Sequence, residues 1–150
     1  QEKILRPCKM RGTSFFNESG GAINASGGAT TTPNDLINFL GMLLNNGSFE
    51  GKTVLSEKSI HEMETLQFVS LPVKFVPKEA AGYKTGLGCW ISNDGKEVTS
   101  LNENGLWPYI DRCRHYAALI APKNRISEPK PELYVQLKEK LDASFGDPCR

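Results

Sequence analysis

The chain has 150 residues, enough for one domain or for part of a larger one. Its formal net charge of +1 gives no field strong enough to recruit nucleic acid or anionic lipid, so both partner classes are excluded. No apolar run approaches the roughly 20 residues that a membrane-spanning helix requires. A hydrophobic content of 39% is nevertheless sufficient for a buried core.

The first helix is predicted to begin at residue 33, after an irregular Gly- and Thr-rich loop over 20–32. Thr32 is a good N-cap, Pro33 suits the first helical position, and Asp35 suits the first turn. Gly47 is predicted to end the helix in a left-handed conformation. One face carries an apolar stripe that we expect to pack on the core: Leu36, Phe39, Leu40, Leu43 and Leu44.

A second helix is predicted after a short connector, capped by Ser56 or by Ser59. Ser59 also forms a capping-box pattern with Glu62. We expect His61 to face solvent on this helix and to have no catalytic role. The predicted buried face consists of Ile60, Met63 and Leu66.

The stretch 82–122 is predicted to form three strands. Residues 87–92 alternate in polarity, and Asn93-Asp94-Gly95 provides a hairpin turn before the return strand over 96–101. A loop rich in Asn, Gly and Pro follows, and then a nearly continuous apolar run, opened by His115, predicts a buried central strand over 115–121. Such a meander needs a layer of helices on one face, which predicts an α+β fold with an antiparallel sheet flanked by helices.

A final helix is predicted over 131–144, opened by Pro131-Glu132. Its charged residues Lys138, Glu139 and Lys140 are expected to form a solvated face. Its predicted apolar stripe consists of Leu133, Tyr134, Leu137 and Leu141.

The four cysteines show no C-x-x-C spacing, and only His61 and His115 could join them as ligands. We therefore predict no metal site. Two possibilities remain open for the cysteines, disulfides or buried thiols. Three N-x-[ST] sequons, which begin at Asn17, Asn24 and Asn46, favour a secreted or lumenal protein, although chance also produces this tripeptide.

The residues alone do not assemble a catalytic site. Neither histidine is tied to a serine, and the glycines of 20–28 lack the G-x-G-x-x-G order of a phosphate cradle, so no cofactor is predicted. Two short segments are better candidates for part of a catalytic site. Lys84-Thr85-Gly86 matches the K-T-G signature of penicillin-recognising serine enzymes, and residues 100–105 form a polar turn between two predicted strands.

Several segments of the chain resemble segments of the serine β-lactamase-like hydrolases and occur in the same order as in that superfamily. The superfamily includes class C β-lactamases, D-alanyl-D-alanine carboxypeptidases and related esterases. Residues 6–15 resemble the stretch P-L-G-M-x-x-T-x-F, with Cys8 and Lys9 in place of Leu and Gly. The other matching segments are 27–44, 55–63, 83–90 and 105–111. The resemblance covers about residues 4–122 and implies the carboxy-terminal portion of a β-lactamase/transpeptidase-like fold.

The resemblance also indicates which of the two short segments corresponds to a catalytic signature. It places the third signature of the superfamily, K-T-G or H-x-G, on Ser100-Leu101-Asn102, which makes Lys84-Thr85-Gly86 a coincidental match. No Lys or His leads the segment, and Asn102 replaces a glycine. The resemblance implies that the backbone N–H of Glu103 is the second oxyanion-hole donor, which needs no particular side chain. The alternative is that Ser100–Gly105 is only a solvated loop.

Two signatures of the superfamily are absent. No Y-x-N occurs, and the single S-x-x-K, at 127–130, follows the last predicted strand in the wrong chain order. Both signatures belong to the amino-terminal half of the superfamily.

We therefore expect residues 1–150 to be a partial domain, the carboxy-terminal fragment of a serine hydrolase. Its parent would perform acyl transfer on a small-molecule or peptide-like ester, amide or lactam, and the fragment would be inactive alone. The alternative is a non-catalytic pseudoenzyme or binding module of the same fold. An exposed sheet edge is expected to cause self-association.

Overall fold

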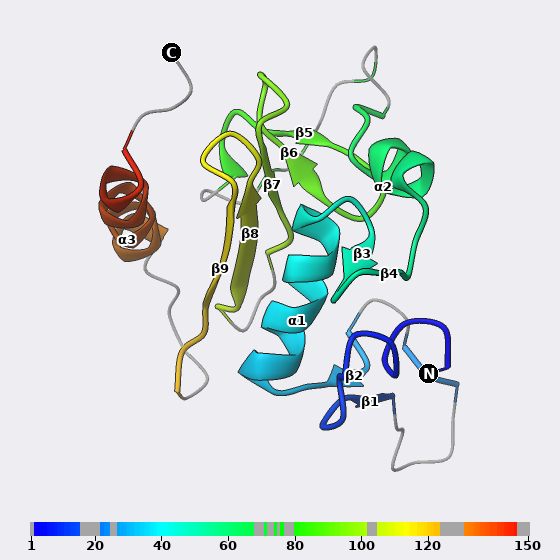
Figure 1. Ribbon diagram of the computed structural model, residues 1–150. Helices are drawn as coiled ribbons and strands as arrows, with labels where there is room; N and C mark the ends of the chain where they lie inside the picture. Colours follow the sequence, from blue (N-terminus) through cyan, green and yellow to red (C-terminus); the bar gives the residue numbers. More distant parts are fainter. Residues whose placement is uncertain are drawn as a thin grey trace.

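The computed structural model describes residues 2–15, 22–24, 27–67, 71, 74, 76, 80–101, 105–123 and 131–146. Its centre is a five-stranded antiparallel sheet in the order β5-β6-β7-β8-β9, with helices against it (Figure 1). The predicted α+β class is confirmed. The strands are β5 Lys84–Thr85, β6 Trp90–Ile91, β7 Glu97–Thr99, β8 Trp107–Asp111 and β9 Tyr116–Ile120.

The prediction of three strands was wrong, because the sheet has five. The two additional strands are the two-residue β5 and β8, which lies in the stretch predicted as a loop and which Pro108 conceals. The carbonyl of Pro108 faces β7 and accepts hydrogen bonds from the Ser100 N–H (3.4 Å) and the Thr99 hydroxyl (2.7 Å). The proline therefore costs the sheet one ladder bond at the end of β7, where strand pairing is already finishing.

The last strand also begins one residue later than predicted. His115 lies in the β8–β9 turn with a φ angle of 53°, and β9 starts at Tyr116. His115 is exposed, as is His61 on the second helix, which agrees with the prediction for His61.

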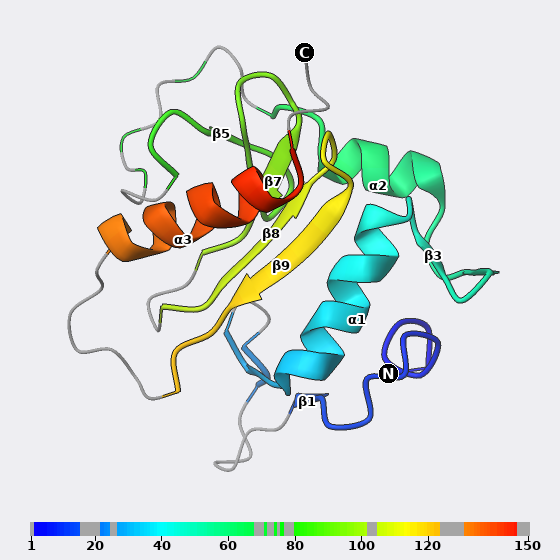
Figure 2. The same cartoon turned by 60° about the vertical axis from the view of Figure 1, so that its left-hand side comes forward.

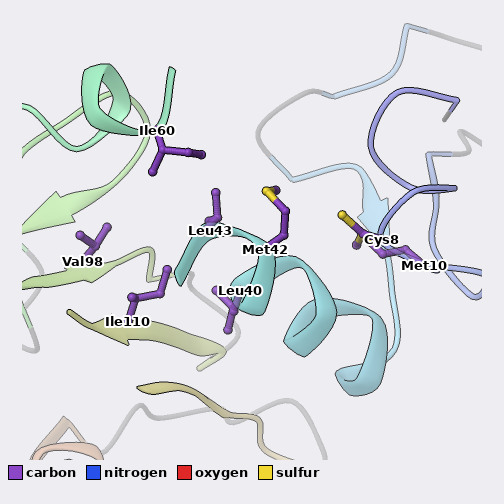
Figure 3. Packing of buried hydrophobic residues seen from close by; sticks show 8 residues of the cluster. All are labelled: Cys8, Met10, Leu40, Met42, Leu43, Ile60, Val98 and Ile110. Atoms are coloured by element: carbon purple, nitrogen blue, oxygen red, sulfur yellow. The ribbon is translucent and has the colours of Figure 1, made fainter. Parts of the chain in front are cut away.

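Helix α1 (Pro33–Leu44) covers one face of the sheet. Leu40 and Leu43 are buried, as the predicted stripe requires, and they pack with Ile110 of β8 (Figure 3). Ala117 and Leu119 of β9 pack against the same cluster. The buried members of this cluster are Cys8, Met10, Leu40, Met42, Leu43, Ile60, Val98 and Ile110.

Helix α3 (Pro131–Ser144) covers the opposite face, so helices lie on both sides of the sheet rather than on one (Figure 2). Tyr134 and Leu141 pack against an aromatic cluster of Trp107, Tyr109 and Tyr116. These aromatic residues alternate along the strands with the residues that face α1, which is the period of two that strand geometry imposes.

Two details of the α3 prediction were wrong. Leu133 and Leu137 were placed in the buried stripe, but they are 51% and 48% exposed. Lys138 was placed on a solvated face, but its side chain is only 13% exposed. Carboxylates from elsewhere in the chain, described below, account for its burial.

The ends of the two shorter helices follow local capping chemistry. The Thr32 hydroxyl accepts from the Asp35 N–H (3.2 Å), as predicted. Two residues after α1 are left-handed, Asn46 (φ 51°) and the predicted Gly47 (φ 88°). The Gly47 N–H donates to the carbonyl of Met42 (2.9 Å), which closes a Schellman motif. Helix α2 (Glu57–Met63) is capped by Ser56 and not by the alternative cap, Ser59.

Two hairpins complete the described elements. Strands β1 (Ser14–Phe15) and β2 (Ala29–Thr30) pair before α1, and β3 (Ser48–Phe49) and β4 (Lys52–Thr53) pair after it. Within the described part of the chain, no helix is long and apolar enough to cross a membrane.

Buried Asp35 connects the first hairpin to α1. One of its carboxylate oxygens accepts from the Gly12 N–H (2.8 Å) and from the Thr13 hydroxyl (2.7 Å), and Thr13 also bonds to the hydroxyl of Thr31 (2.7 Å). The segments 6–15 and 27–44, which resemble the superfamily separately in the sequence, are therefore in direct contact.

Candidate functional site

The candidate site lies where β7 ends and the chain returns to β8. Ser100 directly follows β7 and is exposed, and Leu101 is half-buried against the aromatic cluster beneath α3. Asn102 and Glu103 lie outside the described residues. The structure therefore places Ser100 at the end of an interior strand and leaves the other two site residues as predictions.

A hydrogen-bonded lock fixes the two strand ends beside this connection. Trp107, only 2% exposed, donates from Nε1 to the Thr99 hydroxyl (2.8 Å), and that hydroxyl donates to the carbonyl of Pro108 (2.7 Å). Both partners are buried, so water does not compete with the lock. The connection is thus held at both ends by rigid anchors, which is what a preorganised backbone donor requires.

This lock was missed by the sequence analysis, although Thr99 and Trp107 stand on either side of the candidate segment. Only the register in which the two strands pair could have predicted this contact, because two residues eight positions apart become neighbours only when a hairpin brings their strands together. The register of β7 and β8 pairs Thr99 with Tyr109, which brings Trp107 within reach.

The K-T-G match at Lys84-Thr85-Gly86 lies in a different part of the sheet. Thr85 belongs to the edge strand β5, and its carbonyl accepts from the Gln67 N–H (2.8 Å). A Cβ atom on Gly86 would lie 2.5 Å from the carbonyl oxygen of Met63 at the end of α2. Close packing against α2 therefore accounts for this glycine without a substrate.

A buried charged cluster lies between α3 and the sheet. Lys138 Nζ donates to Glu97 Oε1 (2.6 Å) and to Asp142 Oδ2 (2.8 Å). Tyr83 donates to the same Glu97, and Tyr116 donates to the same Asp142. No local sequence pattern predicts this cluster, since Glu97 and Lys138 are 41 residues apart in the chain.

The carboxylates of the cluster stabilise the charged form of Lys138. Burial opposes the charged form of Lys138, but the hydrogen bonds that it donates to the Asp142 and Glu97 carboxylates outweigh burial and raise its pKa. The cluster therefore fastens α3 to the sheet, because Glu97 belongs to β7 and Lys138 and Asp142 belong to α3.

The cysteines divide into two kinds. Cys113 is disulfide-bonded, whereas Cys8 and Cys89 are free thiols. Burial raises the pKa of Cys89 to about 11, so its reactive thiolate is scarce at neutral pH. Among the residues described, no group of three or more His, Cys, Asp or Glu could hold a metal ion.

Comparison with known proteins extends this picture only at the level of the fold. No family model matches the chain, and no curated protein matches it. A solved protein from Bacteroides dorei, provisionally named a β-lactamase, is 24% identical with a TM-score of 0.70, and the match covers 93% of this chain and 49% of that one. A β-lactamase from Mycobacterium bovis is 21% identical with a TM-score of 0.74, covering 96% of this chain and 54% of that one.

The chain therefore has a β-lactamase-like fold, and the resemblance that the sequence suggested is confirmed at that level. It spans about half the length of these two solved structures.

Proposed function

We propose that the chain is the carboxy-terminal part of a β-lactamase-related serine hydrolase. The reaction would be acyl transfer on an ester, amide or lactam of a small-molecule or peptide-like substrate. One observation carries the proposal: the β-lactamase-like fold is matched over 93% of this chain but over only 49% of the solved protein. The missing S-x-x-K and Y-x-N signatures support the same view, because both belong to the other half of such enzymes.

In this proposal the connection after β7 forms one wall of the substrate cleft. The carbonyl oxygen of the substrate gains negative charge when a serine attacks it, and the backbone N–H of Glu103 stabilises that charge. The lock between Thr99 and Trp107 supports this role, since it holds the strand ends from which the donor is presented. Because the donor is the backbone N–H of Glu103, the change from glycine to Asn102 does not remove it.

The experiment starts from the full-length transcript. An upstream half with S-x-x-K followed by Y-x-N is expected, and the full-length protein should then label with a fluorophosphonate probe and hydrolyse nitrocefin or a p-nitrophenyl ester. Replacement of the S-x-x-K serine by alanine is the control and should abolish labelling. The 150-residue chain alone should give no turnover above a boiled sample, and turnover by it would contradict the proposal.

The second candidate is a pseudoenzyme that retains the fold as a binding or scaffolding module. Ser100 and Asn102 favour it, because they replace the leading cation and the glycine of the third signature. A side chain at position 102 would occupy space that a glycine leaves to the substrate. A full-length protein that folds but does not label with the probe would select this candidate over the hydrolase.

We also propose a secreted or lumenal location. The disulfide at Cys113 supports it, because disulfides persist mainly in oxidising compartments, and the sequon residues Asn24 and Asn46 are exposed. Expression through the secretory route should give a product whose mobility changes on enzymatic removal of N-glycans. A glycan-free product, with its cysteines reduced when isolated under alkylating conditions, would argue for another location.

A further inference from the structure

Two buried side chains, Thr99 and Trp107, are joined by a hydrogen bond inside an otherwise apolar cluster. The Trp107 ring lies 5.7 Å from the Tyr109 ring and 5.8 Å from the Tyr134 ring of α3, measured between centroids. Burial of apolar surface is non-directional and does not by itself fix the orientation of a ring. The bond from Trp107 Nε1 to the Thr99 hydroxyl (2.8 Å) is directional, so it selects one orientation of the indole.

The Thr99 hydroxyl acts both as an acceptor and as a donor. It accepts from Trp107 and donates to the carbonyl of Pro108 (2.7 Å), which also accepts from the Ser100 N–H (3.4 Å). Thr99 is the last residue of β7, and Trp107 is the first residue of β8. One hydroxyl therefore joins the residue before the connection 100–106 to the residue after it.

Helix α3 supports both ends of the same connection. Leu101 packs against the cluster that contains Trp107 and Tyr134, so the two ends of the connection rest on one aromatic surface. Glu97 of β7 accepts from Lys138 of α3 (2.6 Å), which fixes the strand against the helix just before the connection begins. Every partner in this support belongs to this chain, so a longer protein would contain the same contacts.

We propose that Thr99 is a positioning residue of the proposed hydrolase and sets kcat through the orientation of Trp107. The inference rests on the proposed function, because the backbone N–H that the connection would present acts only when a serine attacks the substrate. Thr99 is 4% exposed and bonds to Trp107 and Pro108, so it acts on the connection and not on the substrate. A displacement of the connection by about 1 Å is enough to lower the rate roughly a hundredfold.

Loss of this hydroxyl has a consequence that depends on direction. Valine has nearly the shape of threonine, but in Thr99→Val the buried indole N–H of Trp107 loses its acceptor, and an unsatisfied buried donor is costly. The ring lowers this cost by turning toward water, which moves the first residue of β8 and with it the returning end of the connection. Thr99→Ser keeps a hydroxyl at the same position, so the indole retains its acceptor.

The test measures steady-state hydrolysis of a p-nitrophenyl ester by the full-length protein, at a temperature where all variants are folded by circular dichroism. We expect Thr99→Val to lower kcat by about tenfold or more with little change in KM, because a displaced oxyanion donor affects mainly the transition state. Thr99→Ser should restore most of kcat. Arg112→Met is the control for stability, since it weakens the fold through contacts outside the connection and should keep kcat.

A double-mutant cycle separates one shared bond from two packing effects. Trp107→Phe keeps an aromatic ring but removes the indole N–H, so it pairs with Thr99→Val. If both residues act through one bond, the double variant should lose less kcat, on a logarithmic scale, than the sum of the two single losses. Fully additive losses would show two independent effects and would overturn the proposal.

Hydrogen exchange of the full-length protein gives a readout that needs no turnover. The Ser100 amide shares the Pro108 carbonyl with the Thr99 hydroxyl, so it should exchange faster in Thr99→Val than in Thr99→Ser, and equal exchange overturns the proposal. A folded protein that neither labels with the fluorophosphonate probe nor hydrolyses the ester overturns the proposed function, and the role of Thr99 in the reaction with it. An active protein whose valine variant keeps kcat, or whose valine and serine variants lose kcat equally, overturns only the role of Thr99.

Discussion

Arg112 and Glu64 form a two-point ion pair that joins the β8–β9 turn to the residue that ends α2. Arg112 Nε and Nη2 donate to the two carboxylate oxygens of Glu64 at 2.6 and 2.7 Å. The same guanidinium donates to the carbonyls of Leu43 (2.9 Å) and Leu44 (3.1 Å) at the end of α1. One side chain thus fastens two helices to the sheet. It supplies a donor to the Leu44 carbonyl and a second donor to the Leu43 carbonyl, which also accepts from the Asn46 N–H (3.0 Å).

Replacing this arginine should lower stability substantially. Arg112→Met leaves the mostly buried Glu64 carboxylate and the Leu44 carbonyl without the guanidinium donor, while the Leu43 carbonyl keeps the Asn46 N–H. We expect a loss of about 3 kcal/mol in the free energy of unfolding, at the low end for a buried pair because both side chains retain some solvent exposure. Urea unfolding followed by circular dichroism measures this loss.

The matched control is Lys96→Met. Lys96 pairs with Asp94 at 3.8 Å, and both side chains are largely exposed, so the loss should stay below about 0.5 kcal/mol. Equal losses in the two variants would contradict the special role of Arg112.

The sequence predicted elements whose signals are local. The start of helix α1 at Pro33 and its end before a left-handed Gly47 were predicted correctly, since the cap, the proline and the apolar spacing all act within or beside the helix itself. Strand β8 was missed because Pro108 argues against a central strand, and only the neighbouring strands show that the missing N–H falls where the pairing with β7 ends, while the Pro108 carbonyl still accepts from the Ser100 N–H. Arg112 and Glu64 are 48 residues apart, so no local pattern indicates their pairing.

The candidate site was predictable only in part. The sequence placed the segment that begins at Ser100 between two strands, and in the structure Ser100 directly follows β7, while the role of the segment stays a prediction. The lock between Thr99 and Trp107 depends on strand register, and the burial of Lys138 depends on Glu97, which lies 41 residues away. Such contacts are set by tertiary packing, which a single sequence does not encode in any short window.

A second prediction concerns the carboxylate that ties the amino-terminal segment to α1. Asp35→Ala removes the acceptor of the Gly12 N–H and of the Thr13 hydroxyl, which leaves the partly buried Gly12 N–H unsatisfied and the Thr13 hydroxyl with Thr31 alone. We expect a loss of about 2 kcal/mol in the free energy of unfolding. Asn34→Ala, at the exposed neighbouring position, is the control and should cost little. An equally small loss for both variants, measured by urea unfolding, would show that Asp35 does not hold the segment.

A third prediction is loss of stability at alkaline pH. Burial, and then hydrogen bonding to carboxylates, raises the pKa of Tyr83 and Tyr116 above the ordinary value of 10.0. The folded chain therefore keeps these two protons at a pH where the unfolded chain releases them. Their contribution is complete below about pH 10 and is lost as the pH rises above it.

Absorbance at 295 nm and far-UV circular dichroism, recorded together against pH, test this linkage. The phenolate signal of Tyr83 and Tyr116 should appear together with unfolding and not before it. Tyr83→Phe and Tyr116→Phe should each reduce the slope of stability against pH above pH 10. Ionisation of all four tyrosines near pH 10 with an unchanged far-UV spectrum would contradict the prediction.

The last prediction tests the proposed oxyanion donor in the full-length hydrolase. Glu103→Pro removes the backbone N–H and should lower kcat by about 10²–10³-fold with little change in KM, because the donor acts mainly on the charge of the transition state. Glu103→Ala keeps the N–H and is the matched control, so its kcat should stay close to that of the parent. Steady-state hydrolysis of a p-nitrophenyl ester measures both variants, with the thermal melt as a check on folding. A folded proline variant with unchanged kcat would remove Glu103 from the mechanism, and an equal fall in both variants would assign the effect to its side chain.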